Sequence, residues 1–198
     1  MRPPHPRRLP LLDETLLTRA TGITGEVWSQ LVASGSRFAD MTDPQPMIRV
    51  GSDGQTGVVE ISDILFTSVG SLPGLIMVEW NIAGSSQASA GMWDAHFRVG
   101  GADGTNLQVA DCPTSKPIQP GCIAATMMLH VNGSSNGYFE NMWAWVADHD
   151  LDDPQNTMVS VAVARGILVE SNTASWYASQ SPSSLCFLIC FLQTSAGH

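Results

Sequence analysis

Residues 137–153 read GYFENMWAWVADHDLDD, a stretch in which aromatic and β-branched residues give way to a cluster of carboxylates. Aromatic and β-branched side chains suit the pleated surface of a strand. Asp148, Asp150, Asp152 and Asp153 follow at the point where such a strand would pass into a loop. The stretch therefore predicts a strand that ends in an acidic loop.

The polar residue inside this stretch has counterparts upstream. Asp63 is followed by ILF, Asp94 by AHF and Asn141 by MWAW. A polar residue at a bend followed by a short strand is typical of successive turns of a parallel β-helix. The spacing is 31 residues from Asp63 to Asp94 and 47 from Asp94 to Asn141, so loops of unequal length must bulge between the turns. No helical stripe of useful length interrupts the strands, and the sequence predicts an all-β fold.

The net charge and the lengths of the apolar runs limit the kinds of partner that the chain can bind. The chain has 18 acidic and 9 basic residues and a net charge of −9, which repels phosphate backbones and anionic lipids. We therefore expect neither nucleic acid nor membrane as a partner. Prolines interrupt the basic start, and residues 1–24 are expected to form a disordered lead without a signal peptide. The longest apolar run, residues 185–192, is far below the roughly twenty residues that span a bilayer as a helix.

Four segments together resemble a known family. They read VEISDILFTSVGSLPGLIMVEWN (59–81), GMWDAHFRVGGADGTNLQVADCP (91–113), GYFENMWAWVADHDLDD (137–153) and VAVARGILVES (161–171). They resemble the secreted fungal exo-β-1,3-glucanases of glycoside hydrolase family 55, from about Trp28 to Ser171. The resemblance implies a single-stranded, right-handed parallel β-helix of the pectin-lyase type, with residues 25–171 forming part of the second of two helices. It also implies an extracellular protein that acts on β-1,3-glucan, with no obligate protein partner.

The same resemblance implies that the catalytic residues are missing. In the family two glutamates follow the strand that matches GILVES, one in a Ser-Glu-His and one in a Thr-Glu-Ser-Pro setting, and neither setting occurs here. Residues 172–198 match nothing in the family, and we interpret them as an unmatched, disordered tail of a truncated gene model. We expect an incomplete copy of an inverting glucan 1,3-β-glucosidase, inactive alone. The alternative is a non-catalytic β-helix module that binds glucan or packs against another chain.

Within this chain, Glu140, Asp148 and Asp150 are the candidate catalytic carboxylates. Inverting hydrolysis needs a general acid and a second carboxylate roughly 6.5 to 9.5 Å away. The alternative is that Glu140 bonds to a neighbouring loop and the aspartates form a solvated turn. Trp143 and Trp145 share one face of their strand and are candidate glucan contacts, with burial in the core as the alternative.

The remaining candidate sites are a pair of cysteines and one N-glycosylation motif. Cys112 and Cys122 flank the loop CPTSKPIQPGC, which resembles the disulfide-closed loop of the family, with two unpaired thiols as the alternative. Cys186 and Cys190 are given no role. Asn132 begins an Asn-Gly-Ser acceptor motif for N-glycosylation in a glycine-rich turn.

We expect no metal and no cofactor. No second Cys or His pair stands at zinc-ligand spacing, and His149 is a single histidine among aspartates. A polysaccharide lyase that holds calcium with the carboxylates of residues 148–153 is the less favoured alternative.

Overall fold

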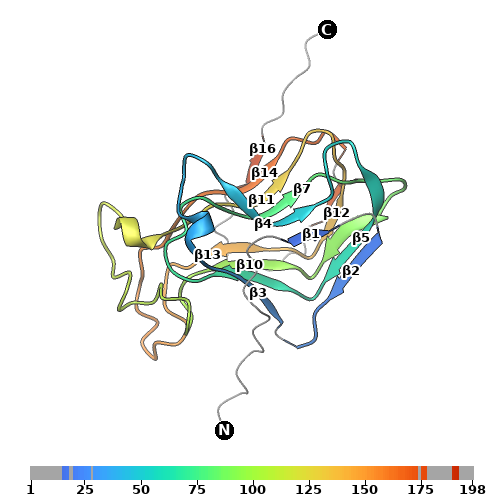
Figure 1. Cartoon of the computed structure of the whole chain (residues 1–198). Helices are drawn as coiled ribbons and strands as arrows, with labels where there is room; N and C mark the ends of the chain where they lie inside the picture. The colour runs from blue at the N-terminus through green and yellow to red at the C-terminus, as the bar shows by residue number, and fades with distance from the viewer. Residues whose placement is uncertain (1–14, 18–19, 28, 174, 178–188, 192–198) are drawn as a thin grey trace.

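The computed structural model describes residues 15–17, 20–27, 29–173, 175–177 and 189–191. Within these ranges the regular structure is β, apart from the short 3-10 turns η1 (Ser36–Phe38) and η2 (Pro120–Cys122). The strands form three sheets, and paired strands run parallel throughout (Figure 1). The prediction of an all-β fold made of stacked parallel strands is confirmed.

Each sheet takes its strands from distant parts of the chain. Sheet A contains β3 (Gln30–Ala33), β6 (Leu65–Ser68), β10 (His96–Val99) and β13 (Ala144–Val146). Sheet B contains β1 (Thr15–Leu17), β4 (Gln45–Val50), β7 (Leu75–Trp80), β11 (Ile123–Val131), β14 (Ala162–Val169) and β16 (Ile189–Phe191). Sheet C contains β2 (Ala20–Thr24), β5 (Thr56–Ser62), β9 (Ala90–Trp93), β12 (Tyr138–Glu140) and β15 (Ser175–Tyr177), with the short β8 (Ala83–Gly84) beside β5.

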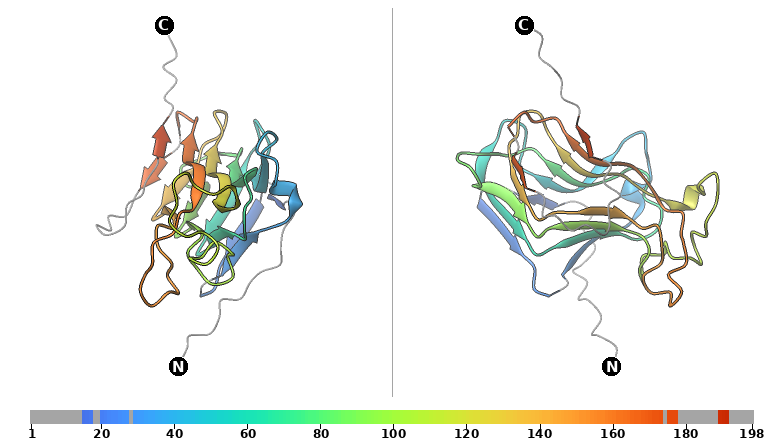
Figure 2. Two further views of the ribbon diagram at one scale, coloured as in Figure 1. Left: turned by 90° about the vertical axis from the view of Figure 1, so that its left-hand side faces the viewer. Right: turned by 180° about the vertical axis from the view of Figure 1, so that it is seen from behind.

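From β4 to β14 the chain visits sheets B, C and A in rotation, so that it coils and each turn stacks on the one before. Figure 2 shows these turns following one another in chain order. The register matches the spacing predicted from the sequence. Leu65 pairs with His96, 31 residues on, and Phe97 pairs with Ala144, 47 residues on.

The predicted bend residues form a column at the corner between sheets C and A. Asp63, Asp94 and Asn141 have left-handed backbones with φ of 57°, 48° and 51°. Asp and Asn tolerate this conformation better than other non-glycine residues. The Asp63 N–H donates to the carbonyl of Trp93 and the Asp94 N–H to that of Glu140, both at 3.2 Å. The Asn141 amide also donates to the Asp94 carboxylate. These local sequence preferences therefore turn the chain at equivalent points of three successive turns.

The core fills the space between the three sheets. Phe66 and Phe97, on neighbouring strands of sheet A, stack with ring centroids 4.9 Å apart. Trp80 of sheet B meets Phe139 of sheet C edge-on at 5.3 Å, and all four side chains are fully buried. The Trp80 indole N–H donates to the carbonyl of Asn136 at 2.8 Å, which satisfies its polar group inside the core. Trp80 is therefore a core residue.

The two longest connections, residues 100–122 and 147–161, both lead from sheet A to sheet B and project from the same end of the coil (Figures 1 and 2). They are joined to each other. The Ser160 N–H donates to the Cys112 carbonyl at 2.9 Å, and the Ser115 N–H donates to the Ser160 hydroxyl at 3.0 Å. Cys112 and Cys122 are both buried and form a disulfide with Cα atoms 5.8 Å apart. The paired state, rather than two free thiols, is the one in the structure.

Strands also occur in the segments for which the sequence predicts disorder. In the lead of residues 1–24, Thr15–Leu17 pairs with β4 and Ala20–Thr24 pairs with β5. In the tail, Ser175–Tyr177 pairs with β12 and Ile189–Phe191 pairs with β14. The physical reason is that each outer strand satisfies the open backbone groups of its neighbour in the coil. Apart from Asn172 and Thr173, the rest of both segments, including Cys186, lies outside the described residues, as does Trp28.

Among the residues that the structure describes, no helix has the length and apolar character needed to cross a bilayer.

The corner column gives a first testable prediction. Replacing Asp94 by Val should lower the free energy of unfolding by about 1–3 kcal/mol, because a β-branched side chain is strained at positive φ. Asp94→Asn is the matched control, since Asn accepts the same backbone conformation and retains an oxygen for Asn141. Denaturant unfolding measures both variants. Equal losses in the two would contradict the role given to the left-handed corner.

Candidate functional site

Aromatic and basic side chains lie on the outer face of sheet A. Phe97 and Val99 are fully buried, so His96 and Arg98, which alternate with them along β10, point outward. The His96 and Trp143 rings stack almost in parallel, with centroids 4.5 Å apart and planes 9° apart. Trp145 pairs with Arg98 in the sheet register. The structure thus brings the two predicted tryptophans together with His96 and Arg98.

Both tryptophans lie outside the fully buried core. The Trp143 side chain is 38% exposed, whereas Trp145 is half-buried and packs partly against the core. The Trp145 ring also contacts His149, with centroids 5.3 Å apart. For Trp143 the alternative of burial in the core is therefore wrong, because its ring is held outside by the stack on His96.

Burial lowers the pKa of both basic side chains on this face. For the His96 imidazole, the nearby carboxylates of Asp94 and Asp63 oppose this effect by raising the pKa. Burial also lowers the pKa of the Arg98 guanidinium, an effect opposed by Asp152.

Four polar atoms on β6 and β10 are buried and have no hydrogen-bond partner among the described residues. They are Nδ1 of His96, Nε of Arg98, Oγ1 of Thr67 and Oγ of Ser68. Most buried polar groups in proteins are paired, so these atoms are exceptions. They have almost no accessible surface and a ligand cannot reach them, so the exposed ring of Trp143 is what this face offers for contact.

The candidate catalytic carboxylates are not gathered in one place. Glu140 is exposed at the end of β12 in sheet C and accepts a 2.9 Å hydrogen bond from the Tyr138 hydroxyl. Asp148 and Asp150 lie beyond β13, in the loop that leaves sheet A. Asp148 is paired with His149, with Oδ1 and Nδ1 2.6 Å apart. The three residues therefore have separate local partners.

Asp150 anchors the two long loops to each other. Its buried carboxylate accepts from the backbone N–H of Val109 at 3.0 Å, from the Gln108 amide at 3.3 Å and from the N–H of Asp152 at 3.1 Å. Burial raises the pKa of Asp150, but the hydrogen bonds lower it further, so that the net change is downward. An ionised carboxylate with these fixed donors suits a structural anchor and does not suit a general acid.

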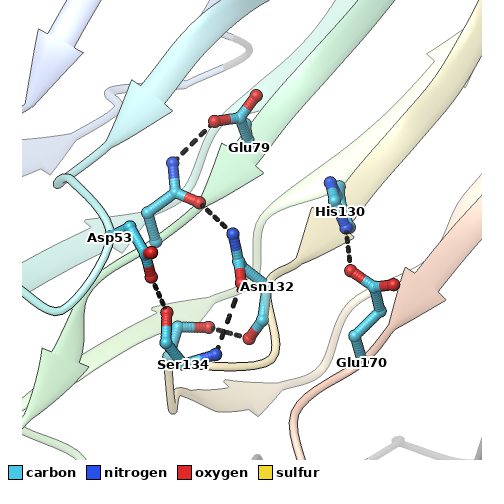
Figure 3. Close-up of polar contacts among 8 residues, drawn as sticks. Asp53, Glu79, His130, Asn132, Ser134 and Glu170 are labelled. Carbon is cyan, nitrogen blue, oxygen red and sulfur yellow. Dashed lines mark hydrogen bonds and ion pairs between the residues drawn. The ribbon is translucent and has the colours of Figure 1, made fainter.

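A second polar network crosses sheet B (Figure 3). The Asn81 side chain donates through Nδ2 to Glu79 at 2.6 Å. Asn132 donates through its own Nδ2 to the side-chain oxygen of Asn81 at 3.2 Å. The backbone N–H of Ser134 contacts the Asn132 side-chain oxygen at 3.3 Å, and the Ser134 hydroxyl contacts Asp53. One hydrogen of the Asn132 amide is thus engaged, and a glycan on this sequon would take the place of the other.

Sequence reasoning missed four ionisable residues in or beside this network. Glu79 accepts from Arg49 Nε at 3.2 Å, and His130 Nε2 lies 2.7 Å from Glu170 Oε2. His130 is directly opposite Glu79 in the register of β7 and β11. The only signal in the sequence is the alternation of each residue with buried neighbours, which does not reveal which strands pair.

Within the described part of the chain, no group of three His, Cys, Asp or Glu side chains is arranged to hold a metal ion.

The anchor role of Asp150 is open to a direct test. Asp150→Asn should lower the free energy of unfolding by about 1.5–3 kcal/mol, because the buried charge-assisted hydrogen bonds from Val109 and Gln108 are weakened. Asp148→Asn is the control, because the Asp148 side chain is 63% exposed and its pairing contributes little. Chemical denaturation of the three proteins measures the difference. A loss no larger in Asp150→Asn than in Asp148→Asn would contradict the anchor.

His96 should make stability depend on pH. Its pKa is lower in the folded chain than the reference value of 6.5, so the unfolded state binds more protons at acidic pH. The stability that neutral His96 contributes is present above about pH 6.5 and is lost as the pH falls. The melting temperature of His96→Phe should therefore fall less than that of the unchanged chain between pH 7.5 and 5.0. Between pH 7.5 and 8.5 the two should respond alike, and equal falls in the acidic range would refute the assignment.

Comparison with known proteins finds relatives that are named as glucan 1,3-beta-glucosidases and as LysM effectors. It is 46% identical over 158 residues to a probable glucan endo-1,3-beta-glucosidase of Arthroderma benhamiae, and the match covers 78% of this chain and 18% of that protein. It is 43% identical over 152 residues to a glucan 1,3-beta-glucosidase of Cochliobolus carbonum, covering 76% and 19%. It is also 40% identical over 185 residues to the non-secreted LysM effector LysM15 of Penicillium expansum, covering 92% and 13%. No family model matches the chain.

The matched regions cover most of this chain but a small part of each relative. The chain spans 13 to 19% of the length of these three proteins. The glucanase matches are too similar and too long for chance, and the coiled parallel sheets agree with the expectation drawn from the sequence. The chain therefore belongs to the family of the fungal β-1,3-glucanases, as a segment that corresponds to less than a fifth of their length.

Proposed function

We propose that the chain is a β-helical segment of a secreted exo-β-1,3-glucanase of glycoside hydrolase family 55. In this proposal the three-sheet coil is a right-handed, single-stranded β-helix of the pectin-lyase type. The parallel pairing of all three sheets and the rotation of the chain through them support it. The segment supplies one wall of a glucan-binding cleft in an extracellular hydrolase and has no catalytic activity alone.

One observation carries the proposal, namely the composition of the outer face of sheet A. Trp143 offers an exposed ring that is held flat by the stack on His96. Trp145 lies in the same sheet, where it pairs with Arg98 in the register. An apolar ring face matches the apolar face of a glucose unit. Trp143 and Trp145 are the residues that we propose to contact the glucan.

The separation of the carboxylates supports inactivity. Asp150 is ionised and buried among donors, Asp148 is paired with His149, and Glu140 belongs to another sheet. Inverting hydrolysis needs one protonated and one ionised carboxyl group on opposite sides of the same bond. The local partners of these three carboxylates do not favour such a pair.

A non-catalytic module that binds glucan or packs against another chain is the second candidate. It is favoured by the match to LysM15, a protein named as an effector, which covers 92% of this chain. Binding without turnover agrees with both candidates. Restoring activity by adding the remainder of a glucanase would agree with the first alone.

The purified chain should bind laminarin, a soluble β-1,3-glucan, without releasing reducing sugar. Trp143→Ala should raise the Kd about two- to tenfold, because one aromatic contact is lost. Trp143→Phe keeps an aromatic ring on His96 and should bind nearly as well as the unchanged chain. Calorimetry measures binding and a reducing-sugar assay measures turnover. Clear turnover would contradict the proposed inactivity, and equal affinity of all three proteins would contradict the proposed site.

A further inference from the structure

A second aromatic pair lies on a different face of the coil. Trp93 of β9 and Tyr138 of β12 stack with ring centroids 5.7 Å apart and planes 30° apart. Met92 and Phe139, their neighbours in sequence, are fully buried. Because side chains alternate along a strand, Trp93 and Tyr138 point outward from sheet C, and both are half-buried.

A glycine allows the Trp93 ring to lie close to the sheet. Gly91 precedes Trp93 by two residues and pairs with Tyr138 in the register. A Cβ atom at Gly91 would lie 2.9 Å from Cη2 of Trp93 and 2.4 Å from the Tyr138 carbonyl oxygen. Any side chain there would therefore collide with the indole and with the neighbouring strand. Because Gly91 has no side chain, the indole of Trp93 can lie close to the backbone of the sheet.

Exposed carboxylates flank the two rings. Glu140 pairs with Trp93 in the register and accepts a hydrogen bond of 2.9 Å from the Tyr138 hydroxyl. On the other side, Glu60 of β5 pairs with Gly91 and is exposed. The surface thus combines ring faces with acceptors, and its negative charge disfavours acidic ligands.

We propose that Glu60, Gly91, Trp93, Tyr138 and Glu140, here called the sheet C platform, form a second saccharide-binding surface. Its ligand is a neutral chain of β-linked hexopyranose. The apolar face of a sugar ring lies on Trp93 and Tyr138, and its hydroxyl groups donate to Glu60 and Glu140. The choice of a β-1,3-glucan as ligand rests on the function proposed above, whereas the existence of the platform does not.

The platform is separate from the tryptophan face of sheet A. Asp94 and Asn141, with their left-handed backbones, turn the chain between the two faces. Trp93 directly precedes Asp94, whereas Trp143 follows Asn141 by two residues. The rings of the two sites therefore belong to different sheets on either side of a corner. Two separate sites on one chain should contribute independently to binding of a long glucan.

Binding of laminarihexaose to the whole chain tests the platform. Trp93→Ala should raise the Kd of the platform about two- to tenfold. Glu140→Gln should raise it in the same direction by a smaller factor, and this exposed substitution leaves the packing of Trp93 in place. Met41→Ala is the matched control, because Met41 is 56% exposed and lies in the connection between β3 and β4, outside both sets of proposed contacts. A hexamer of galacturonic acid, which is anionic, should not bind.

Nuclear magnetic resonance separates the two sites without relying on stability. The indole N–H signal of Trp93 should shift during a laminarihexaose titration of the unchanged chain, and the shift should persist in Trp143→Ala. The platform proposal would be overturned if the Trp93 signal does not move and both Trp93→Ala and Glu140→Gln bind with wild-type affinity. The same result is expected if this face packs against a protein instead of a saccharide. If Trp143→Ala still weakens binding in that case, the function proposed for sheet A stands. If Trp93 shifts while Trp143→Ala binds normally, the platform stands and the sheet A site fails.

Discussion

Main-chain hydrogen bonding between stacked turns is the interaction on which this structure depends. Each inner strand of sheets A, B and C finds its partners in the turn before and the turn after, and within the described residues no short hairpin closes a sheet locally. Backbone N–H and C=O groups buried away from water must be paired, so the stacking fixes the register of every turn. The same requirement accounts for β2 and β15, which pair with neighbours at opposite ends of sheet C.

The stacking also divides the side chains into an inner set and an outer set. Phe66, Phe97, Trp80 and Phe139 fill the interior, where close packing leaves no room for a functional role. The outer positions are free to carry other chemistry. They place an aromatic and basic face on sheet A and a pair of rings with carboxylates on sheet C.

The long loops add rigidity next to the sheet A face. The disulfide closes residues 112–122, and by the chain-entropy account a loop of this size stabilises the fold by about 3 kcal/mol. Asp150 then holds the neighbouring loop through Val109 and Gln108. The acidic loop, which carries two of the three candidate carboxylates, is part of the support for the aromatic face in the structure.

Local residue types by themselves determined the β class of this protein, the corners at Asp63, Asp94 and Asn141, and the spacing of the turns. These features depend on the backbone conformations that individual residue types prefer, and the residue types can be read directly from the sequence. Tertiary structure alone decided that Asp150 faces Gln108, that His130 lies opposite Glu79, and that Trp93 stacks on Tyr138. These partners are 42, 51 and 45 residues apart. They meet because the turns stack. The corner spacing indicates the register near Asp94 and Asn141, but it does not state which side chains come into contact, nor the register of sheet B or of the long loops.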